Sequence, residues 1–309
     1  MDDEIRTLAW TLVDELVGSV GLPKTRPFRL LAWFLFRGVL TRFSGACLSI
    51  DRITRDEGLP RACAWALSYL GVKIEARGVE HIPPTGPLLV VANHPGSFDA
   101  FLVFSRLARK DIQWISTEIP FLRSLPHVSS HVIFASRTDA RSRITALRAA
   151  IRHLNDGGTL LYFGAGHRDP DPSVYPGAAE QMDTWLPGID VFFRHVPGLQ
   201  MLPTVVSGVV SPGWARHPIT WLRRKPIDSR RLAEFGQVIS LLLRPGRHTL
   251  DSAVSFGLPT TLAQLRDESS GLDTLPAVIA REKGLLAEHM AWRLAAPPRE
   301  PPAPSDLDG

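Results

Sequence analysis

The apolar positions of the first 65 residues recur at a helical period. Over residues 1–20 they fall three and four apart, which predicts an amphipathic helix with its apolar face at Ile5, Leu8, Leu12, Val13, Leu16, Val17 and Val20. Acidic residues at the start of this segment favour the positive end of the helix dipole, and Gly21 and Pro23 end the helix. A second helix is predicted from about Pro27 to Leu48, where aromatic side chains are interspersed among arginines.

From residue 66 the pattern changes to short strands separated by helical segments. Residues 88–92 are uniformly apolar, as expected of a buried strand. Other strands are predicted at 72–76, 112–116, 159–163 and 202–210, with an apolar patch at 132–135; helices are predicted from about 98, over 139–155, and at the periphery over 227–243 and 277–293. Strands that alternate with helices predict an α/β fold, a layered sheet flanked by helices.

The chain therefore divides into three parts. Residues 1–65 form N-terminal amphipathic helices, residues 66–293 form the α/β domain, and the proline-rich residues 294–309 form a disordered tail. With 309 residues, of which 44% are apolar, the chain is long enough for one large core.

The distribution of charge along the chain indicates where the protein acts. The net charge is only +4, but no acidic residue lies between Leu16 and Ile50, a segment that holds Lys24, Arg26, Arg29, Arg37 and Arg42. A basic, aromatic-rich helix suits an anionic lipid surface; the alternative is a core helix with solvated arginines. No helix-turn-helix or zinc-finger signature supports nucleic acid as the partner.

No segment approaches the ~18 uncharged apolar residues of a spanning helix, and the acidic N-terminus is unlike a signal peptide. The two cysteines, Cys47 and Cys63, indicate neither a disulfide framework nor a thiolate metal site. We expect a cytoplasmic protein that associates peripherally with a membrane.

The strongest candidate for chemistry follows the buried strand at 88–92. Residues 93–99 read NHPGSFD, so His94 and Asp99 lie five apart across a tight Pro-Gly turn. Such strand ends are where α/β proteins place their sites. A carboxylate that holds one imidazole nitrogen as a donor leaves the other free to take a proton. On the residues alone, a structural turn histidine is an equally good interpretation.

Four segments, in order, resemble the motifs of the glycerolipid acyltransferases, a family that includes the 1-acylglycerol-3-phosphate acyltransferases. They are residues 93–99, residues 131–137 (HVIFASR), residues 161–168 (LYFGAGHR) and residues 202–205 (LPTV). The resemblance covers residues 66–210, about half the chain, and implies the fold of glycerol-3-phosphate acyltransferase. It also implies that His94 is the general base and Asp99 its orienting partner. Arg137 and Arg168 would bind an anionic group of the acceptor, with ordinary surface solvation as their alternative, and Gly166 would let the backbone approach that group.

The third motif departs from the family pattern Phe-Pro-Glu-Gly-Thr-Arg, because Gly164, Ala165 and His167 replace the proline, the glutamate and the threonine. Alanine cannot hydrogen-bond a glycerol hydroxyl, so the identity of the acceptor stays open. The cluster His167-Arg168-Asp169-Pro170-Asp171 is interpreted as a solvated turn rather than a metal loop. His127 and His131 have the spacing of a helical zinc site, but the nearby Pro126 favours a loop.

Three functions fit these observations. The first is an acyltransferase of phospholipid biosynthesis or remodelling. It would move a fatty acyl group from acyl-CoA or acyl-carrier protein to a lysolipid hydroxyl, without a metal or prosthetic group and with amides near Gly96 stabilising the oxyanion. The second is a non-catalytic lipid-binding protein, favoured by Ala165. The third is a hydrolase that directs water to the same thioester.

Overall fold

The computed structural model describes residues 2–19, 23, 25–136, 138–222, 226–243, 250–268 and 273–295. Within these residues, seven strands form one sheet in the order β1-β7-β6-β2-β5-β3-β4. The strands are β1 (Val72–Arg77), β2 (Leu88–Ala92), β3 (Ile112–Ser116), β4 (Val132–Phe134), β5 (Thr159–Phe163), β6 (Gln200–Ser207) and β7 (Leu250–Phe256). All neighbouring pairs are parallel except β6 and β7. The predicted α/β class is confirmed.

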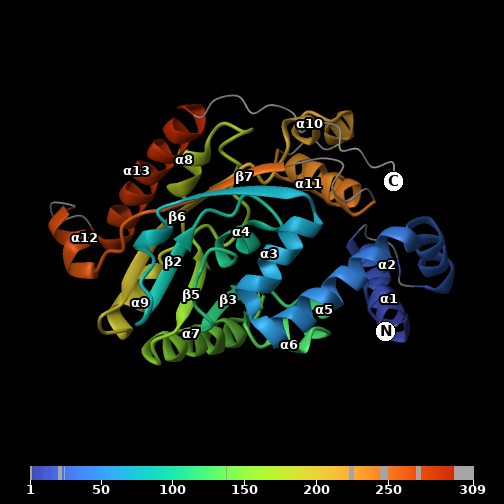
Figure 1. The fold of residues 1–309 in the computed structure, drawn as a ribbon, viewed down its shortest axis with the longest axis horizontal. Coiled ribbons are helices and arrows are strands. Elements are labelled where there is room, and N and C mark those ends of the chain that lie inside the picture. Colours follow the sequence, from blue (N-terminus) through green and yellow to red (C-terminus); the bar gives the residue numbers. More distant parts are fainter. Residues whose placement is uncertain are drawn as a thin grey trace, which may run out of the picture.

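Helices cover both faces of this sheet (Figure 1). They are α1 (Asp2–Ser19), α2 (Arg26–Glu57), α3 (Leu59–Tyr69), α4 (Asp99–Phe104), α5 (Pro120–Arg123), α6 (Pro126–Ser129), α7 (Ala140–Asn155), α8 (Ala178–Met182), α9 (Gly188–His195), α10 (Pro212–Ala215), α11 (Pro226–Leu243), α12 (Leu262–Glu268) and α13 (Thr274–Ala295), with 3-10 turns η1 (Val79–His81) and η2 (Pro218–Leu222). The proposed division into 1–65, 66–293 and 294–309 stays a prediction, although α3 runs across residue 65.

Strand β2 lies near the centre of the sheet and is buried along its whole length. Its side chains alternate between two cores: Leu89 and Val91 pack with α7, α9 and α13, while Leu88 and Val90 pack with α3 and α4. This double coverage explains why the strand is uniformly apolar. Ala92, the last residue of β2, is level with Phe163 of β5 and Thr204 of β6. The loops that follow these parallel strands therefore leave the sheet at one edge.

Helix α2 is longer than predicted, because it continues past Leu48 to Glu57. Its later turns pack on the protein, and the carboxylate of Asp51 accepts hydrogen bonds of 2.9 Å from the backbone amides of His127 and Val128 at the start of α6. One 18-residue window of this helix is apolar enough to cross a membrane by length and composition alone. The sequence analysis looked for an uncharged run of that length and found none, and the arginines of α2 still interrupt every such run.

Helix α13 was predicted at the periphery, but it packs against β6 and contributes Ala277, Val278 and Leu286 to the core. Its Glu282 is fully buried, and burial raises the pKa of that carboxyl well above the usual value. Its His289 is also fully buried, and both ring nitrogens lie 2.7 Å from hydroxyls, of Ser207 and Ser255. Burial lowers the pKa of His289 to about 4, so this is a neutral structural histidine.

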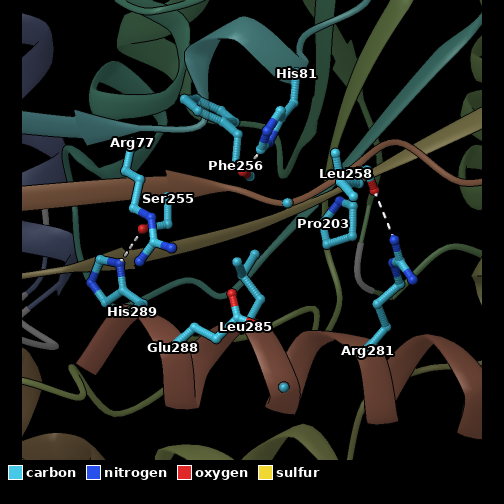
Figure 2. A pocket seen from close by; sticks show the side chains of 12 residues that line it. Arg77, His81, Pro203, Ser255, Phe256, Leu258, Arg281, Leu285, Glu288 and His289 are labelled. Carbon is cyan, nitrogen blue, oxygen red and sulfur yellow. Dashed lines mark hydrogen bonds between the residues drawn. The ribbon is translucent and has the colours of Figure 1, made fainter. Parts of the chain in front are cut away.

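Strand β7 was not predicted. It pairs parallel with β1 and antiparallel with β6. Beside it, α13 leaves a cavity of about 430 Å³ lined by residues of β1, η1, β6, β7 and α13 (Figure 2). The loops after β2 and β5 do not line this cavity, and Figure 2 shows His289 bound to Ser255 at its side. The cavity is therefore separate from the candidate site described next.

Candidate active site

Asn93 fixes the start of the loop that follows β2. This residue is 1% exposed, and its side-chain amide donates to the carbonyl of Val206 at 2.9 Å while its Oδ1 accepts from the amide of Val206 at 2.8 Å. The two bonds extend the pairing of β2 with β6 by one residue after the strand ends. Residue 94 is thereby held at the edge of the sheet where the neighbouring loops emerge.

His94 and Asp99 are in direct contact, as predicted. Nδ1 of His94 lies 2.7 Å from Oδ2 of Asp99. The carboxylate is 1% exposed and also accepts from the backbone amides of Gly96 at 3.1 Å and Ala100 at 2.7 Å. Because an ionised carboxylate only accepts, Nδ1 carries the hydrogen and Nε2 is the acceptor. The imidazole stacks on Phe163 at a centroid distance of 4.3 Å and remains 27% exposed, so one nitrogen is fixed while the ring keeps access to solvent.

The electrostatic surroundings set the proton affinity of His94. Burial lowers its pKa, but the adjacent Asp99 raises it through its charge and its hydrogen bond, and Asp169 adds to this while Arg168 opposes it; the net shift of the pKa is upward. A raised pKa makes the imidazole a stronger base, and the neutral form dominates only above that pKa.

If His94 is the base, the rate will follow this titration. We expect kcat/KM to rise with pH through a midpoint above 6.5, the ordinary histidine pKa. The Asp169→Asn variant keeps an oxygen for the backbone hydrogen bond but loses the negative charge, so its midpoint should move to lower pH. The measurement is a pH–rate profile of both proteins. A midpoint at or below 6.5 in the wild type would contradict the role of Asp99.

The loop after β5 is bound to the His94 turn by Asp169. Its Oδ2 accepts from the amide of His94 at 2.8 Å, and its own amide donates to the carbonyl of His94 at 2.9 Å. Asp171, two residues on, accepts from the amides of Gly208, Val209 and Val210 at 2.7–3.0 Å. Both aspartates are nearly inaccessible, at 3% and 1% exposed. The interpretation of this segment as a solvated turn was therefore wrong: it holds three loops together.

Arg168 lies beside the His94 turn and is already paired. Its guanidinium donates to the carboxylate of Glu234 from α11 and, from Nη2, to the hydroxyl of Ser97 at 3.1 Å. Glu234 is 2% exposed, and burial raises the pKa of its carboxyl while the charge of Arg168 opposes that rise. Glu234 was not predicted, because the predicted helix at 227–243 holds both Asp228 and Glu234 and no local pattern distinguishes the buried carboxyl from the more exposed one.

Gly166, Gly96 and Arg137 are the other residues to which the sequence assigns a role. Gly166 adopts a left-handed φ of 64°, and an added Cβ would lie 3.0 Å from Leu186, so the turn itself favours glycine. The amide of Gly96 is engaged by Asp99 and is not available to an oxyanion, so oxyanion stabilisation by other amides near Gly96 stays a prediction. Arg137 lies outside the described residues. The assignments of Arg137, Gly166 and Arg168 as substrate-binding residues stay predictions.

Fold and geometry together define an α/β protein with a histidine–carboxylate pair at the carboxyl edge of a parallel strand. Residues 73–186, which include this pair, match the family model described as Acyltransferase. This match, over about a third of the chain, confirms the resemblance to the glycerolipid acyltransferases that the motifs indicate.

Curated relatives agree with this assignment. The chain is 26% identical over 148 residues to the 1-acyl-sn-glycerol-3-phosphate acyltransferase alpha of Homo sapiens, covering 47% of this chain and 52% of the relative. The enzyme of the same name from Ovis aries is 26% identical over 153 residues, 47% of this chain and 51% of the relative. The chain thus spans about half the length of the curated relatives it matches. A solved 1-acyl-sn-glycerophosphate acyltransferase from Thermotoga maritima aligns over 96% of this chain and 99% of its own, at 18% identity and a TM-score of 0.43.

Proposed function

We propose that this protein transfers a fatty acyl group from an acyl thioester, acyl-CoA or acyl-carrier protein, to the hydroxyl of a lysolipid in phospholipid biosynthesis or remodelling. The observation that carries the proposal is the 2.7 Å contact between Nδ1 of His94 and the buried Asp99, on a ring that is still 27% exposed. A fixed, partly accessible imidazole of raised pKa is suited to general base catalysis.

In the proposed reaction the acceptor hydroxyl binds beside Nε2 of His94. The proton moves from the hydroxyl to Nε2 as the oxygen attacks the thioester carbonyl, and Asp99 stabilises the imidazolium that forms. The carbon–sulfur bond then breaks, and the leaving thiolate takes the proton from the imidazolium. The products are an ester and a free thiol, and His94 returns to its neutral form, so the chemistry requires no metal or prosthetic group.

The protein's own thiols are unsuited to covalent catalysis. Cys47 and Cys63 are both buried, and burial raises the pKa of Cys47 to about 12 and that of Cys63 further still. Since the thiolate is the nucleophilic form, direct transfer to the acceptor is the mechanism that the described residues favour.

The test is an assay of the purified chain with labelled acyl-CoA and acyl-carrier protein, each with and without lysolipids. Formation of a diacyl lipid that depends on the acceptor supports the proposal. Release of free fatty acid without an acceptor would identify a hydrolase. Bound lipid with no turnover of either thioester would identify a lipid-binding protein.

We also propose that the first turns of α2 bind a membrane surface. Four large apolar side chains are exposed there: Leu30 at 51%, Leu31 at 55%, Phe34 at 71% and Leu35 at 62%. Arg26 and Arg37 flank them, and arginines beside an apolar helix face favour binding to anionic lipid. In Figure 1 this end of α2 lies with α1 at one side of the molecule, away from α12 and α13. Because the later turns of α2 pack on the protein, we propose peripheral association rather than a span.

Removing this apolar surface should release the protein from lipid. For a variant with Leu31, Phe34 and Leu35 all changed to serine, we expect binding to anionic vesicles to fall at least tenfold, because each side chain loses about 1.5 kcal/mol or more of burial in lipid. Vesicle sedimentation measures this. A matched control changes Ile144, Leu258 and Leu294, which are exposed elsewhere, to serine. Equal losses in both variants, or resistance of the wild type to extraction with alkaline carbonate, would contradict peripheral binding through α2.

A further inference from the structure

The described residues around His94 carry more negative than positive charge. Three carboxyl groups, of Asp99, Asp169 and Glu234, interact electrostatically with the imidazole or with one another, and Arg168 is the cation among them. All three carboxyl-bearing residues are at most 3% exposed. Water therefore screens these charges poorly, and a ligand that approaches His94 experiences them at short range.

The one guanidinium in this group is neutralised by its partner. Arg168 is bound to Glu234 on one side and to Ser97 on the other. Glu234 lies directly against the His94 turn, because a Cβ added at Gly96 would be 3.3 Å from its Oε1. The pair is thus part of the site, and an anion that approached Arg168 would also meet the carboxylate of Glu234.

The headgroup of a phosphomonoester lipid would be repelled by this arrangement of charges. A phosphomonoester carries about −1.5 to −2 charges near neutral pH, and here it would add to carboxylates that have no surplus of cations beside them in the described residues. A hydroxyl, or a headgroup whose charges cancel, meets no such repulsion and can still hydrogen-bond to Ser97 and to the paired guanidinium.

We propose that the acceptor's polar end carries no net negative charge, and that Glu234 sets this preference by holding Arg168. Glu234 is a positioning residue in this account, because it acts through the guanidinium. The inference rests on the proposed acyl transfer to a lysolipid, and it narrows the class of that acceptor. It also bears on Ala165, which replaces the glutamate of the family pattern. In this protein the carboxylate beside Arg168 is that of Glu234 on α11, rather than one from the loop after β5.

The test compares three acceptors with the same acyl chain: 1-acylglycerol, which is uncharged; 1-acylglycerol-3-phosphoethanolamine, which is net neutral; and 1-acylglycerol-3-phosphate. For the wild type we expect kcat/KM at least tenfold higher for a net-neutral acceptor than for the phosphomonoester. In the Glu234→Gln variant the ratio of kcat/KM for the net-neutral acceptor to kcat/KM for the phosphomonoester should fall at least tenfold. The change should come mainly from a lower KM for the phosphomonoester, because the charge of Arg168 is no longer opposed by Glu234.

The control is Glu282→Gln, which replaces another buried carboxyl, on α13, and should leave the ratio unchanged. A wild type that uses the phosphomonoester as well as or better than the neutral acceptors overturns the inference, and this comparison needs no variant. An unchanged ratio in a folded Glu234→Gln protein overturns the role of Glu234. In both cases the proposed acyl transfer would stand, whereas failure to acylate any acceptor would overturn the function as well.

Discussion

Replacing His94 with alanine is expected to lower kcat/KM for acyl transfer at least 100-fold. The variant loses the group that takes the hydroxyl proton, and positioned bases contribute roughly 100- to 10,000-fold. The buried Asp99 would then lie beside an empty volume and could not substitute, because its carboxylate is engaged by the amides of Gly96 and Ala100. The loss should appear in kcat rather than in the affinity for the thioester.

The assay is the same as for the wild type, with single-turnover measurements to separate chemistry from product release. His195→Ala is a suitable control, because His195 is exposed and its Nδ1 contacts only a carbonyl of its own helix, that of Val191. Circular dichroism and the thermal midpoint confirm folding of both proteins. If His94→Ala retained more than about a tenth of the activity, the assignment of the base would fail.

Asp171→Ala should destabilise the protein by about 4 kcal/mol, since three buried backbone amides lose a charged acceptor at ~1–3 kcal/mol each, with partial relaxation. The carboxylate accepts from Gly208, Val209 and Val210 and also from the amide and hydroxyl of Ser173. Asp171→Asn, which keeps one acceptor oxygen, should lose roughly half as much. The midpoint of urea unfolding measures both effects.

The control for this comparison is Asp183→Ala. Asp183 is 59% exposed and pairs with Lys283 at 2.7 Å, and exposed ion pairs contribute about 1 kcal/mol or less. Similar losses for Asp171→Ala and Asp183→Ala would show that the loop after β6 does not depend on the buried carboxylate.

Local sequence patterns predicted the centre of the sheet well. Residues 88–92, 112–116 and 159–163 form strands with the predicted bounds. For 88–92 the reason is local, because a short apolar run between turns has few other ways to be buried. The contact of His94 with Asp99 was also predictable, because both partners lie in one turn and their separation depends on local geometry alone.

The features that could not be predicted depend on contacts between distant segments. Glu234 is 66 residues from Arg168, and Asp171 binds amides 37 to 39 residues away, so no local pattern links them. Strand β7 contains Asp251, Ser252 and Ser255, polar residues that weaken its apolar signal, and its place between β1 and β6 is set by the rest of the sheet. Polar residues that are buried for tertiary reasons resemble solvated loops in a sequence.

The length of helix α2 has one more consequence for the proposed acyl transfer at a membrane surface. Helix α2 is a single helix of 32 residues, about 48 Å long at 1.5 Å per residue. Its apolar first turns are therefore continuous with its last turns, which Asp51 of α2 joins to α6. With its first turns in the headgroup layer, as proposed, this helix would set the height of the His94 imidazole above the bilayer. The enzyme would then also select acceptors by the distance between the hydroxyl and the acyl chains, because the hydroxyl must reach His94 while the chains stay in the bilayer.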